Sequence, residues 1–357
     1  MIFDRPDLEN VPPEIRSYIE MLEAELEESR RSTNRTNRRP TQSSPPTSED
    51  TTFGQYDEIE PSEPPTSLNL VTATASGIAK RTARHLYTRQ NRGGMGIFDL
   101  ETTEDEPPSI LTIVDEHQSS LLISKMGRAF RIPTMAIPEA PIRSRGASII
   151  AKMSLPEDDH VSAIIPEQAQ GYLALASRSG MVRLLRHHVF GEYMKQGTSL
   201  YDLRIFGPLS SVCWTSGEQD LFLATRHGRA IRFSEKLVPP QGTQGIRLTD
   251  EDEVVAITAV HPDSGVFLLG SDGKGTIRLM EGFSANKSPG AGGKIAMTTD
   301  QLVFAGTTDD CRDVFIISRL SKIIRFRLEQ IPVKDGVVQG VVCMSLRADQ
   351  PIAAILA

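Results

Sequence analysis

The residues best suited to binding an anion are the stretch Gln90-Asn91-Arg92-Gly93-Gly94-Met95-Gly96, which follows the cations Lys80, Arg81, Arg84 and Arg89. Glycine tolerates positive φ and leaves backbone N–H groups uncovered. Uncovered N–H groups beside a guanidinium suit the close approach of a phosphate. The stretch therefore predicts an exposed basic loop that contacts DNA. The candidate contacts are Lys80, Arg81, Arg84, Arg89, Gln90, Arg92, Gly93, Gly94 and Gly96.

A less basic and less glycine-rich form of this pattern recurs along the chain. Six times, an apolar run is followed by a turn and a short segment ending in arginine, and a glycine comes 13 to 15 residues later. The arginines are Arg81, Arg131, Arg183, Arg232, Arg278 and Arg325, spaced 46 to 52 residues apart. A period of about 40–50 residues built from short strands is typical of a β-propeller with one blade per repeat.

The segments within each repeat are short and rich in aliphatic residues. Leu221-Phe222-Leu223-Ala224 and Val314-Phe315-Ile316-Ile317 are examples, bounded by Gly, Asp, Ser or Pro. Such segments predict strands joined by turns. The sequence therefore predicts an all-β fold over residues 67–357, a six-bladed propeller of four-stranded blades.

The first 66 residues have a different character. Prolines followed by Ile15, Ile19, Leu22 and Leu26 predict one short amphipathic helix within residues 1–31. Residues 32–66 are dominated by Ser, Thr, Pro and acidic residues, which predicts a disordered linker. Residues 1–66 carry 7 Lys and Arg against 15 Asp and Glu, whereas residues 67–357 carry 32 against 31. Any binding of nucleic acid by the propeller must therefore come from the placement of its charges.

The sequence offers no signal for secretion, membrane insertion or metal binding. It shows no signal peptide and no apolar run long enough to span a bilayer. Cys213, Cys311 and Cys343 lack metal-ligand spacing, which favours reduced thiols in a cytoplasmic protein. The acidic runs at 157–159 and 250–253 lack the pattern of a calcium loop, so they are interpreted as solvated connectors. No metal, cofactor or small-molecule substrate is expected.

The repeats and the stretch at 90–96 resemble the C-terminal domain of DNA gyrase A, which belongs to a β-propeller repeat family that also includes topoisomerase IV. The box of that family runs Gln-[Arg/Lys]-Arg-Gly-Gly-[Arg/Lys]-Gly, often after a tyrosine, as Tyr87-Thr88-Arg89-Gln90 here. The resemblance covers residues 67–357. It implies a six-bladed propeller whose outer rim wraps DNA, in a bacterial, nucleoid-associated setting. Asn91 and Met95 replace two cations of the box, so fewer phosphate contacts are expected.

The resemblance does not extend to catalysis. No tyrosine follows an arginine, as the nucleophile of the breakage–reunion domain does, and a helix and linker stand where that domain would lie. Gly290-Ala291-Gly292-Gly293-Lys294 lacks the spacing of a nucleotide-binding P-loop. The chain is therefore expected to be non-enzymatic, with no catalytic residues.

Cations in the glycine-containing connectors are the remaining candidates for DNA contact. Connectors lie on the rim of a propeller, and no aromatic residues are interleaved that would stack on bases. Sequence-nonspecific contacts to duplex phosphates are expected. The repeated arginines favour a structural role, such as a carbonyl clamp, over a DNA-contacting one. The connector candidates are Arg143, Arg145, Lys195, Arg247, Lys287 and Lys294.

Two other functions fit the same sequence. The near-neutral domain, the depleted box and the acidic leader suit a protein-interaction scaffold that kept the fold and lost strong DNA wrapping. Alternatively, the helix at 13–31, in the form of a short coiled coil, would join the propeller to a separately encoded gyrase or topoisomerase IV core.

Overall fold

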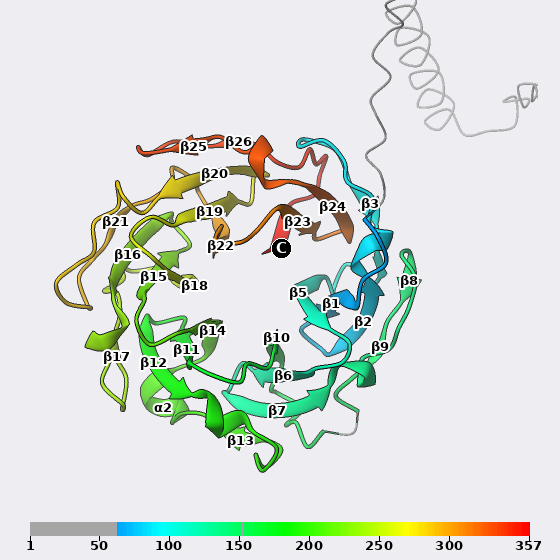
Figure 1. Ribbon diagram of the computed structural model, residues 1–357, viewed down its shortest axis with the longest axis horizontal. Coiled ribbons are helices and arrows are strands. Elements are labelled where there is room, and N and C mark those ends of the chain that lie inside the picture. Colours follow the sequence, from blue (N-terminus) through cyan, green and yellow to red (C-terminus); the bar gives the residue numbers. More distant parts are fainter. Residues whose placement is uncertain (1–62, 152) are drawn as a thin grey trace, which may run out of the picture. The chain divides into compact units, whose positions relative to one another are not determined.

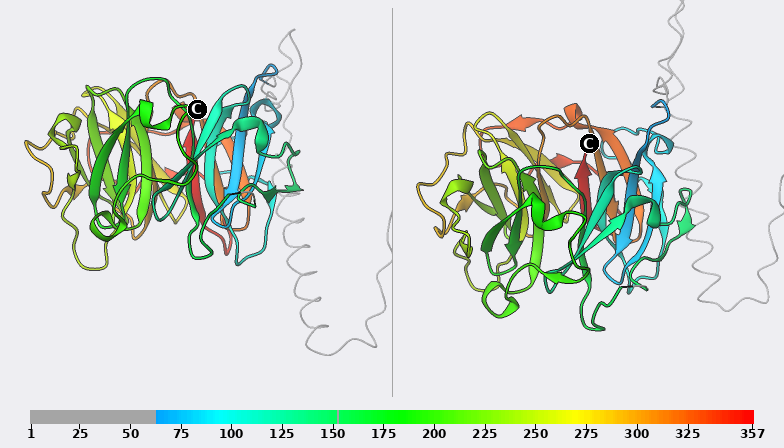
Figure 2. Two further views of the ribbon diagram at one scale, coloured as in Figure 1. Left: turned by 90° about the horizontal axis from the view of Figure 1, so that it is seen from below. Right: turned by 60° about the horizontal axis from the view of Figure 1, so that its bottom comes forward.

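The computed structural model describes residues 63–151 and 153–357, and within them the chain forms a ring of six blades around a central axis (Figure 1). Each blade is an antiparallel sheet built on a β-hairpin, and we number the blades 1 to 6 in the chain order of these hairpins. Side views show the sheets standing next to one another around the ring (Figure 2). The six-bladed propeller predicted from the repeats is thereby confirmed. The predicted helix and the linker up to residue 62 lie outside the described residues.

The two middle strands of each blade form its hairpin, with a tight turn that has positive φ at glycine in blades 1 to 5 and at Ser321 in blade 6. The hairpins are β1 (Leu68–Thr74) with β2 (Ile78–Ala83), β6 (Ser119–Ser124) with β7 (Arg128–Pro133), β11 (Tyr172–Ser177) with β12 (Met181–Arg186), β15 (Asp220–Thr225) with β16 (Arg229–Ser234), β19 (Gly265–Gly270) with β20 (Lys274–Leu279), and β23 (Asp313–Ser318) with β24 (Lys322–Arg327).

The innermost strand of each blade pairs with the first strand of the hairpin and borders the ring axis (Figure 1). In every blade, the register of this pairing shifts near one end. The inner strands, in blade order, are β5 (Pro108–Asp115), β10 (Val161–Pro166), β14 (Leu209–Thr215), β18 (Val254–Val260), β22 (Leu302–Thr307) and β27 (Pro351–Leu356).

The outermost strand of each blade comes from the connector of the next repeat. The chain leaves one hairpin, crosses back to the outer edge of the preceding blade, and then returns as the inner strand of its own blade. These short strands are β9 (Ala147–Ser148), β13 (Thr198–Ser199), β17 (Thr243–Gln244), β21 (Lys294–Ile295), β25 (Val333–Lys334) with β26 (Val341–Val342), and β3 (Ile97–Phe98), on blades 1 to 6 respectively. Because β3 follows the hairpin of blade 1 in the chain but pairs with β24 of blade 6, it closes the ring.

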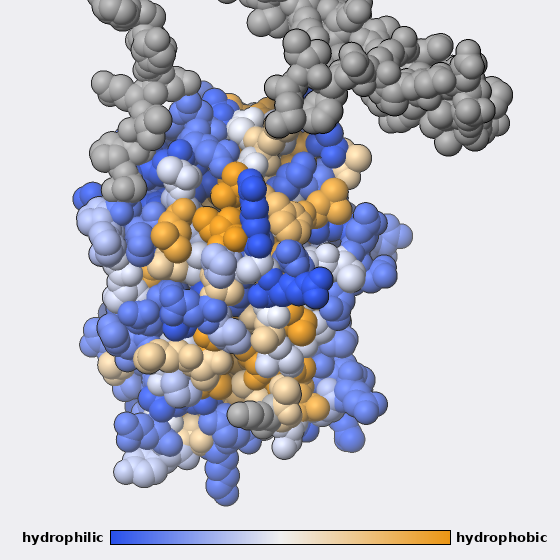
Figure 3. Space-filling view, turned by 90° about the vertical axis from the view of Figure 1, so that its right-hand side faces the viewer, coloured by the Kyte–Doolittle hydropathy of each residue, from blue (hydrophilic) through white to orange (hydrophobic). Residues whose placement is uncertain are grey.

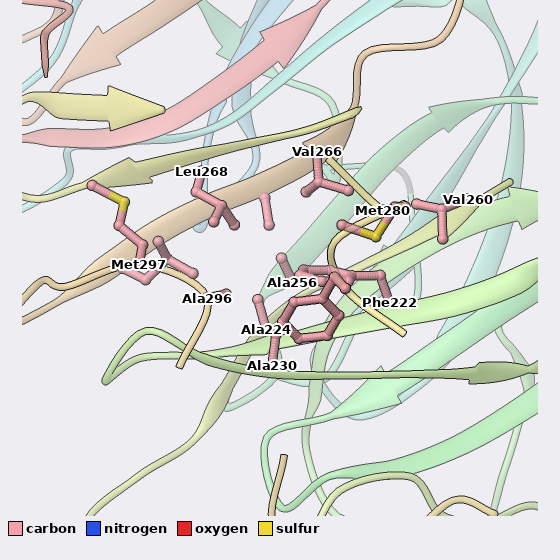
Figure 4. Packing of buried hydrophobic residues seen from close by; sticks show 13 residues of the cluster. Phe222, Ala224, Ala230, Ala256, Val260, Val266, Leu268, Met280, Ala296 and Met297 are labelled. Carbon is pink, nitrogen blue, oxygen red and sulfur yellow. The ribbon is translucent and has the colours of Figure 1, made fainter. Parts of the chain in front are cut away.

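The hydrophobic core is divided among the six junctions between blades. Each junction contains its own cluster of buried apolar side chains. At the junction of blades 4 and 5, Phe222 and Ala224 of one sheet face Val266 and Leu268 of the next (Figure 4). Neighbouring blades therefore stabilise each other, as expected for repeats that cannot bury their apolar surfaces alone.

This arrangement explains why the strands are apolar without alternation. In β23, Val314 and Ile316 face blade 5, whereas Phe315 and Ile317 face blade 1. Successive side chains of a strand point to opposite faces, so a sheet covered on both faces requires a continuous apolar run.

Helical structure is minor in the part of the chain that the structure describes. The α-helix there, α2 (Leu203–Phe206), spans a single turn, capped at its start by the Asp202 carboxylate. A one-turn 3₁₀ segment follows the second hairpin strand in blades 1 to 4 and in blade 6. None of these described helices has the length and apolarity that a membrane crossing would need.

Candidate nucleic-acid interface

The loop at 90–96 crosses from blade 1 to blade 6, where it leads directly into β3. Its backbone is tied to the sixth repeat by four hydrogen bonds. The N–H of Gln90 donates to the carbonyl of Arg325, and that of Gly93 to the carbonyl of Cys343. The Arg92 N–H donates to Gln330 Oε1 at 2.7 Å, and the Gly94 carbonyl accepts from Ser345 N at 3.0 Å. The loop therefore acts as a clasp across the closing seam of the ring.

The cations of this loop are largely engaged within the protein. Arg89 makes a bidentate ion pair with Asp313, with nitrogen–oxygen distances of 2.7 and 3.1 Å. Arg92 is half-buried, and its Nη1 donates to the Val342 carbonyl at 2.6 Å. Asn91 and Met95 are exposed. Arg92, the cation within the loop at 90–96, is thus already bound to a carbonyl.

A cluster of ion pairs lies behind the clasp. Arg325 contacts both Asp313 and Glu63, and Arg84 also pairs with Glu63. Burial alone would raise the pKa of Asp313, but hydrogen bonds from Arg89 and Arg325 outweigh it and lower the pKa. Burial opposes the lowering at Glu63 too, where the pairs with Arg84 and Arg325 depress the pKa. Three arginines and two carboxylates therefore join blade 6 to blade 1 electrostatically.

The two junctions that flank blade 6, one of which is the seam between blades 6 and 1, differ from the other four in their backbone. At four junctions, the first residue of an inner strand donates its N–H to the hairpin turn of the preceding blade, as Val161 does to the Ala75 carbonyl at 2.8 Å. The equivalent residues of blades 6 and 1 are Pro351 and Pro108. Because proline has no N–H, the two junctions that flank blade 6 lack this bond.

The candidate cations in the connectors, unlike those of the loop at 90–96, are all exposed. Each lies on, or within seven residues of, the outermost strand of a blade. Arg145 pairs with Glu101 at 2.9 Å, and Lys294 Nζ lies 3.1 Å from Ser284 Oγ. The side chains of Arg143, Lys195, Arg247 and Lys287 have no ion-pair or hydrogen-bond partner among residues 63–151 and 153–357. The rim of blades 1 to 4 therefore offers exposed positive charge.

The surface near the clasp is mixed in character. Seen from the side of β3, β8 (Ser144–Arg145) and β9, apolar patches alternate with strongly hydrophilic side chains (Figure 3). Among the exposed apolar residues are Met95, Phe98 and Val342, which lie on the loop at 90–96, on β3 and on β26.

The comparison with known families agrees with this architecture. A sequence model described as DNA gyrase C-terminal domain, beta-propeller, matches residues 68–106, 121–166, 219–261 and 312–357. The first of these segments contains the clasp and the last contains blade 6. The chain belongs to the DNA gyrase C-terminal domain family.

Relatives of this family are similar across most of the chain. The DNA gyrase A proteins of Staphylococcus aureus strains MRSA252 and NCTC 8325 are 26% identical over 318 residues, which is 85% of this chain and 36% of the relative. The chain thus spans about a third of the length of these curated relatives. A solved gyrase A C-terminal domain superposes with a TM-score of 0.71 at 19% identity, covering 81% of this chain and 99% of that one. A topoisomerase IV C-terminal domain gives 0.59 at 18% identity, covering 81% and 93%.

Two of the predicted DNA contacts, Lys80 and Arg81, are wrong, because both side chains are buried in this gyrase-type propeller. Lys80 is fully buried, and its Nζ donates to Asp99 Oδ1 at 2.8 Å and to the carbonyls of Asp99 and Pro141. Burial lowers the pKa of Lys80, and Asp99 partly offsets this. Arg81 is 6% exposed and donates to the Ile137 carbonyl. Both side chains are held by carboxylates and carbonyls inside the protein, so neither is available to a phosphate.

The structural role expected for the repeated arginines holds for Arg81, Arg232 and Arg325. Each donates to carbonyls in the connector of the next blade, as Arg232 does to Met280 and Phe283 at 2.8 and 3.3 Å. Arg183 and Arg278 do not share the position of the other repeated arginines. Four arginines lie four residues after the positive-φ residue of the turn, whereas Arg183 lies three and Arg278 five residues after it. An odd offset turns the side chain to the opposite face of the sheet.

The glycine that recurs before the outer strands, which includes Gly96 of the family box, is required because a side chain there would collide with the neighbouring strand. A Cβ on Gly96, where φ is +72°, would lie 2.6 Å from the Ile323 carbonyl oxygen of the strand that β3 joins. Equivalent glycines precede β9, β21 and β26. In the fourth repeat this position belongs to Gly242, whose Cβ would lie 2.8 Å from the Val182 oxygen, rather than to Gly245 as the spacing predicted.

Sequence reasoning missed two exposed cations on the rim, Lys334 and Arg128. Lys334 lies in β25 at the outer edge of blade 5, and Arg128 pairs in register with Ser199 of β13. The candidates predicted from the sequence are cations in the glycine-containing connectors of the earlier repeats. The same criterion applied to the connector of the sixth repeat would have found Lys334. Arg128 carries no such signal.

The remaining polar groups are structural. The carboxylates of Asp159 and Asp252, within the acidic runs predicted to be solvated, are buried and accept hydrogen bonds from the turn N–H groups of Met126 and His227. Burial raises the pKa of Cys213 and Cys343 to about 12, which keeps both thiols protonated. No group of three or more potential metal ligands occurs in the described part of the chain.

Proposed function

We propose that this propeller binds duplex DNA along its outer rim, through phosphate contacts, and bends or wraps the duplex without catalysing a reaction. The observation that carries the proposal is the exposed cation at the outer strand of each of blades 1 to 5. These are Arg143 and Arg145, Lys195, Arg247, Lys287 and Lys294, and Lys334. Membership of a family named for DNA gyrase supports it.

The geometry favours contact with the backbone of a bent duplex. The outer strands succeed one another around the ring, so a duplex that follows them would meet a cation at each of blades 1 to 5. Exposed lysine and arginine on short connectors suit contact with phosphates, and phosphate contacts carry no sequence information directly. Binding should therefore depend weakly on sequence and strongly on salt.

The connector cations can be tested directly. Replacing Lys195, Arg247 and Lys294 by glutamine should weaken duplex binding and reduce the slope of log K on log salt by about three units, since each phosphate contact contributes about one. Replacing exposed Lys236, which pairs with Glu218, is a matched control expected to leave both quantities unchanged. Equal binding by the triple variant and the wild type would contradict the proposal.

A protein-interaction scaffold is the second candidate, and the exposed apolar residues at the clasp favour it. Met95 is 62% and Phe98 39% exposed at the seam, where the family box usually carries a cation in place of Met95. A type II topoisomerase core acting in trans is the partner that the family suggests. Capture of a purified core by the full chain, and its loss on Met95→Lys with Phe98→Thr, would support this function. Capture that both substitutions leave intact would exclude the clasp as the docking surface.

A further inference from the structure

Arg278 is an exception among the buried cations of the ring. It lies in β20 and is 7% exposed, and neither Nε nor Nη1 has a hydrogen-bond partner although both are enclosed. Its guanidinium also forms no ion pair with any described residue. Arg232, by contrast, pairs with Asp220 at 2.8 Å and clamps two carbonyls. A buried guanidinium without an acceptor is unfavourable, so its place in a folded protein calls for an explanation.

The offset of Arg278 accounts for its lack of partners. Because it lies five residues after the turn glycine, its side chain points to blade 4, away from the carbonyls that the clamping arginines reach on the following blade. There its guanidinium carbon lies 5.9 Å from the ring centre of Phe283, which is fully buried. Phe283 belongs to the core between blades 4 and 5, part of which Figure 4 shows.

Two further cations approach the same place. Lys294 Nζ lies 4.5 Å from the Phe283 ring centre and 3.1 Å from Ser284 Oγ. Lys334 is the register partner of Arg278 in the neighbouring strand β25. Lys294 and Lys334 are both exposed, on the outermost strands of blades 4 and 5. The buried guanidinium thus shares the Phe283 ring with one exposed lysine and its register position with another.

The nearby carboxylates do not neutralise this group. Burial lowers the pKa of Arg278 from its ordinary value, and the field of Asp335 only partly opposes the effect. Asp335 and Glu281 are exposed, and neither forms an ion pair within the described part of the chain. The local charge therefore remains positive.

We propose that the junction of blades 4 and 5 is a phosphate-binding site, with Arg278 as its anchor and Lys294, Lys334 and the Ser284 hydroxyl around it. A phosphate presents several acceptor oxygens, which match a guanidinium fork together with ammonium and hydroxyl donors. The phosphate could belong to a duplex backbone or to free orthophosphate. This inference deepens the proposed function, because the outer strands that carry the two lysines form the rim proposed to bind DNA.

The test uses the full chain with two ligands, a long duplex and orthophosphate alone. Arg278→Gln should weaken duplex binding several-fold and reduce the salt slope by about one unit. Arg183→Gln is the matched control, since Arg183 also has an enclosed Nε without a partner but lies at another junction. Asp335→Asn, which removes the competing carboxylate, should tighten binding of both ligands. Thermal unfolding of each variant verifies the fold, and Lys294→Gln provides an exposed replacement should Arg278→Gln fail to fold.

The outcomes separate this site from the proposed function. Loss of orthophosphate binding in Arg278→Gln, with duplex binding unchanged, would support a site for free phosphate. If the wild type binds orthophosphate through Arg278 but binds no duplex, the proposed function fails and the site stands. Wild-type binding of both ligands in Arg278→Gln and Lys294→Gln would overturn the site, as would the absence of orthophosphate binding together with a duplex affinity insensitive to Arg278.

Discussion

At the scale of single residues, the cations of the ring divide into two groups by their exposure. Lys80, Arg81 and Arg325 are buried and hold carboxylates and carbonyls of neighbouring segments. Lys195 and Arg247 are exposed on connectors, without such partners among the described residues. The first group should affect stability and the second should affect binding, so substitutions can distinguish them.

Lys80→Met should strongly destabilise the protein. The substitution leaves the fully buried Asp99 carboxylate with only the hydroxyls of Tyr87 and Thr72 and no cation. Removing one partner of a buried ion pair typically costs about 3–5 kcal/mol. Lys195→Met, at an exposed position, should change the free energy of unfolding by less than about 0.5 kcal/mol and should weaken DNA binding. Urea unfolding of both variants measures the difference, and similar stabilities would contradict the structural role of Lys80.

Acid should selectively weaken the seam. The pKa of Asp313 and of Glu63 is lower in the folded protein than in the unfolded chain, so their contribution is present above the unfolded-state values and is lost as the pH falls through the folded ones. The loss should therefore occur below about pH 4. Asp313→Asn should destabilise the protein at pH 7, and its difference from the wild type should shrink at pH 3. A pH-independent difference in melting temperature would contradict this account.

At the scale of elements, four junctions have a backbone hydrogen bond from the first residue of the inner strand to the preceding blade, whereas the two junctions that flank blade 6, the seam among them, lack it. Pro351 and Pro108 remove those bonds on both sides of blade 6. The ion pairs of Asp313 and the loop at 90–96 act in their place. Blade 6 is thus the position at which the ring should open most readily.

Hydrogen exchange should locate this opening. Amides of β3 and β27, at the seam, should exchange faster than those of the equivalent strands β13 and β14. The reason is that local opening there breaks fewer backbone hydrogen bonds between blades. Raising the salt concentration should increase the difference, since it screens the half-exposed part of the ion-pair cluster. Equal protection in both pairs of strands would contradict a weaker seam.

The sequence predicts the propeller well because the repeat period and the apolar runs reflect packing that every blade shares. It predicts the outer strands poorly, since β9 and β13 are two residues long and carry no apolar pattern. In the sequence, Lys80 cannot be distinguished from a surface cation, because its partner Asp99 lies 19 residues later, after the loop at 90–96. The offsets of Arg183 and Arg278 differ by one residue from the common position, and a repeat alignment tolerates such a shift although the side chain changes face.

At the scale of the whole molecule, charge placement matters more than net charge. Residues 67–357 are almost neutral, with 32 basic and 31 acidic residues. Several aspartates inside the ring form ion pairs with buried or half-buried lysine and arginine side chains. The connector cations, by contrast, are exposed at the outer edge. A near-neutral propeller can therefore present a positive rim, and its affinity for a duplex should respond to salt as a polycation does.

The most direct test of this account is the binding of the full chain to a long relaxed duplex across a salt series. The account predicts tight binding at low salt and a steep decline, with a slope of log K on log salt of about −5 if six rim cations contact phosphates. Duplexes of unrelated sequence should give the same slope. A flat response at millimolar affinity would contradict the proposed DNA-binding rim and would favour the protein-interaction scaffold.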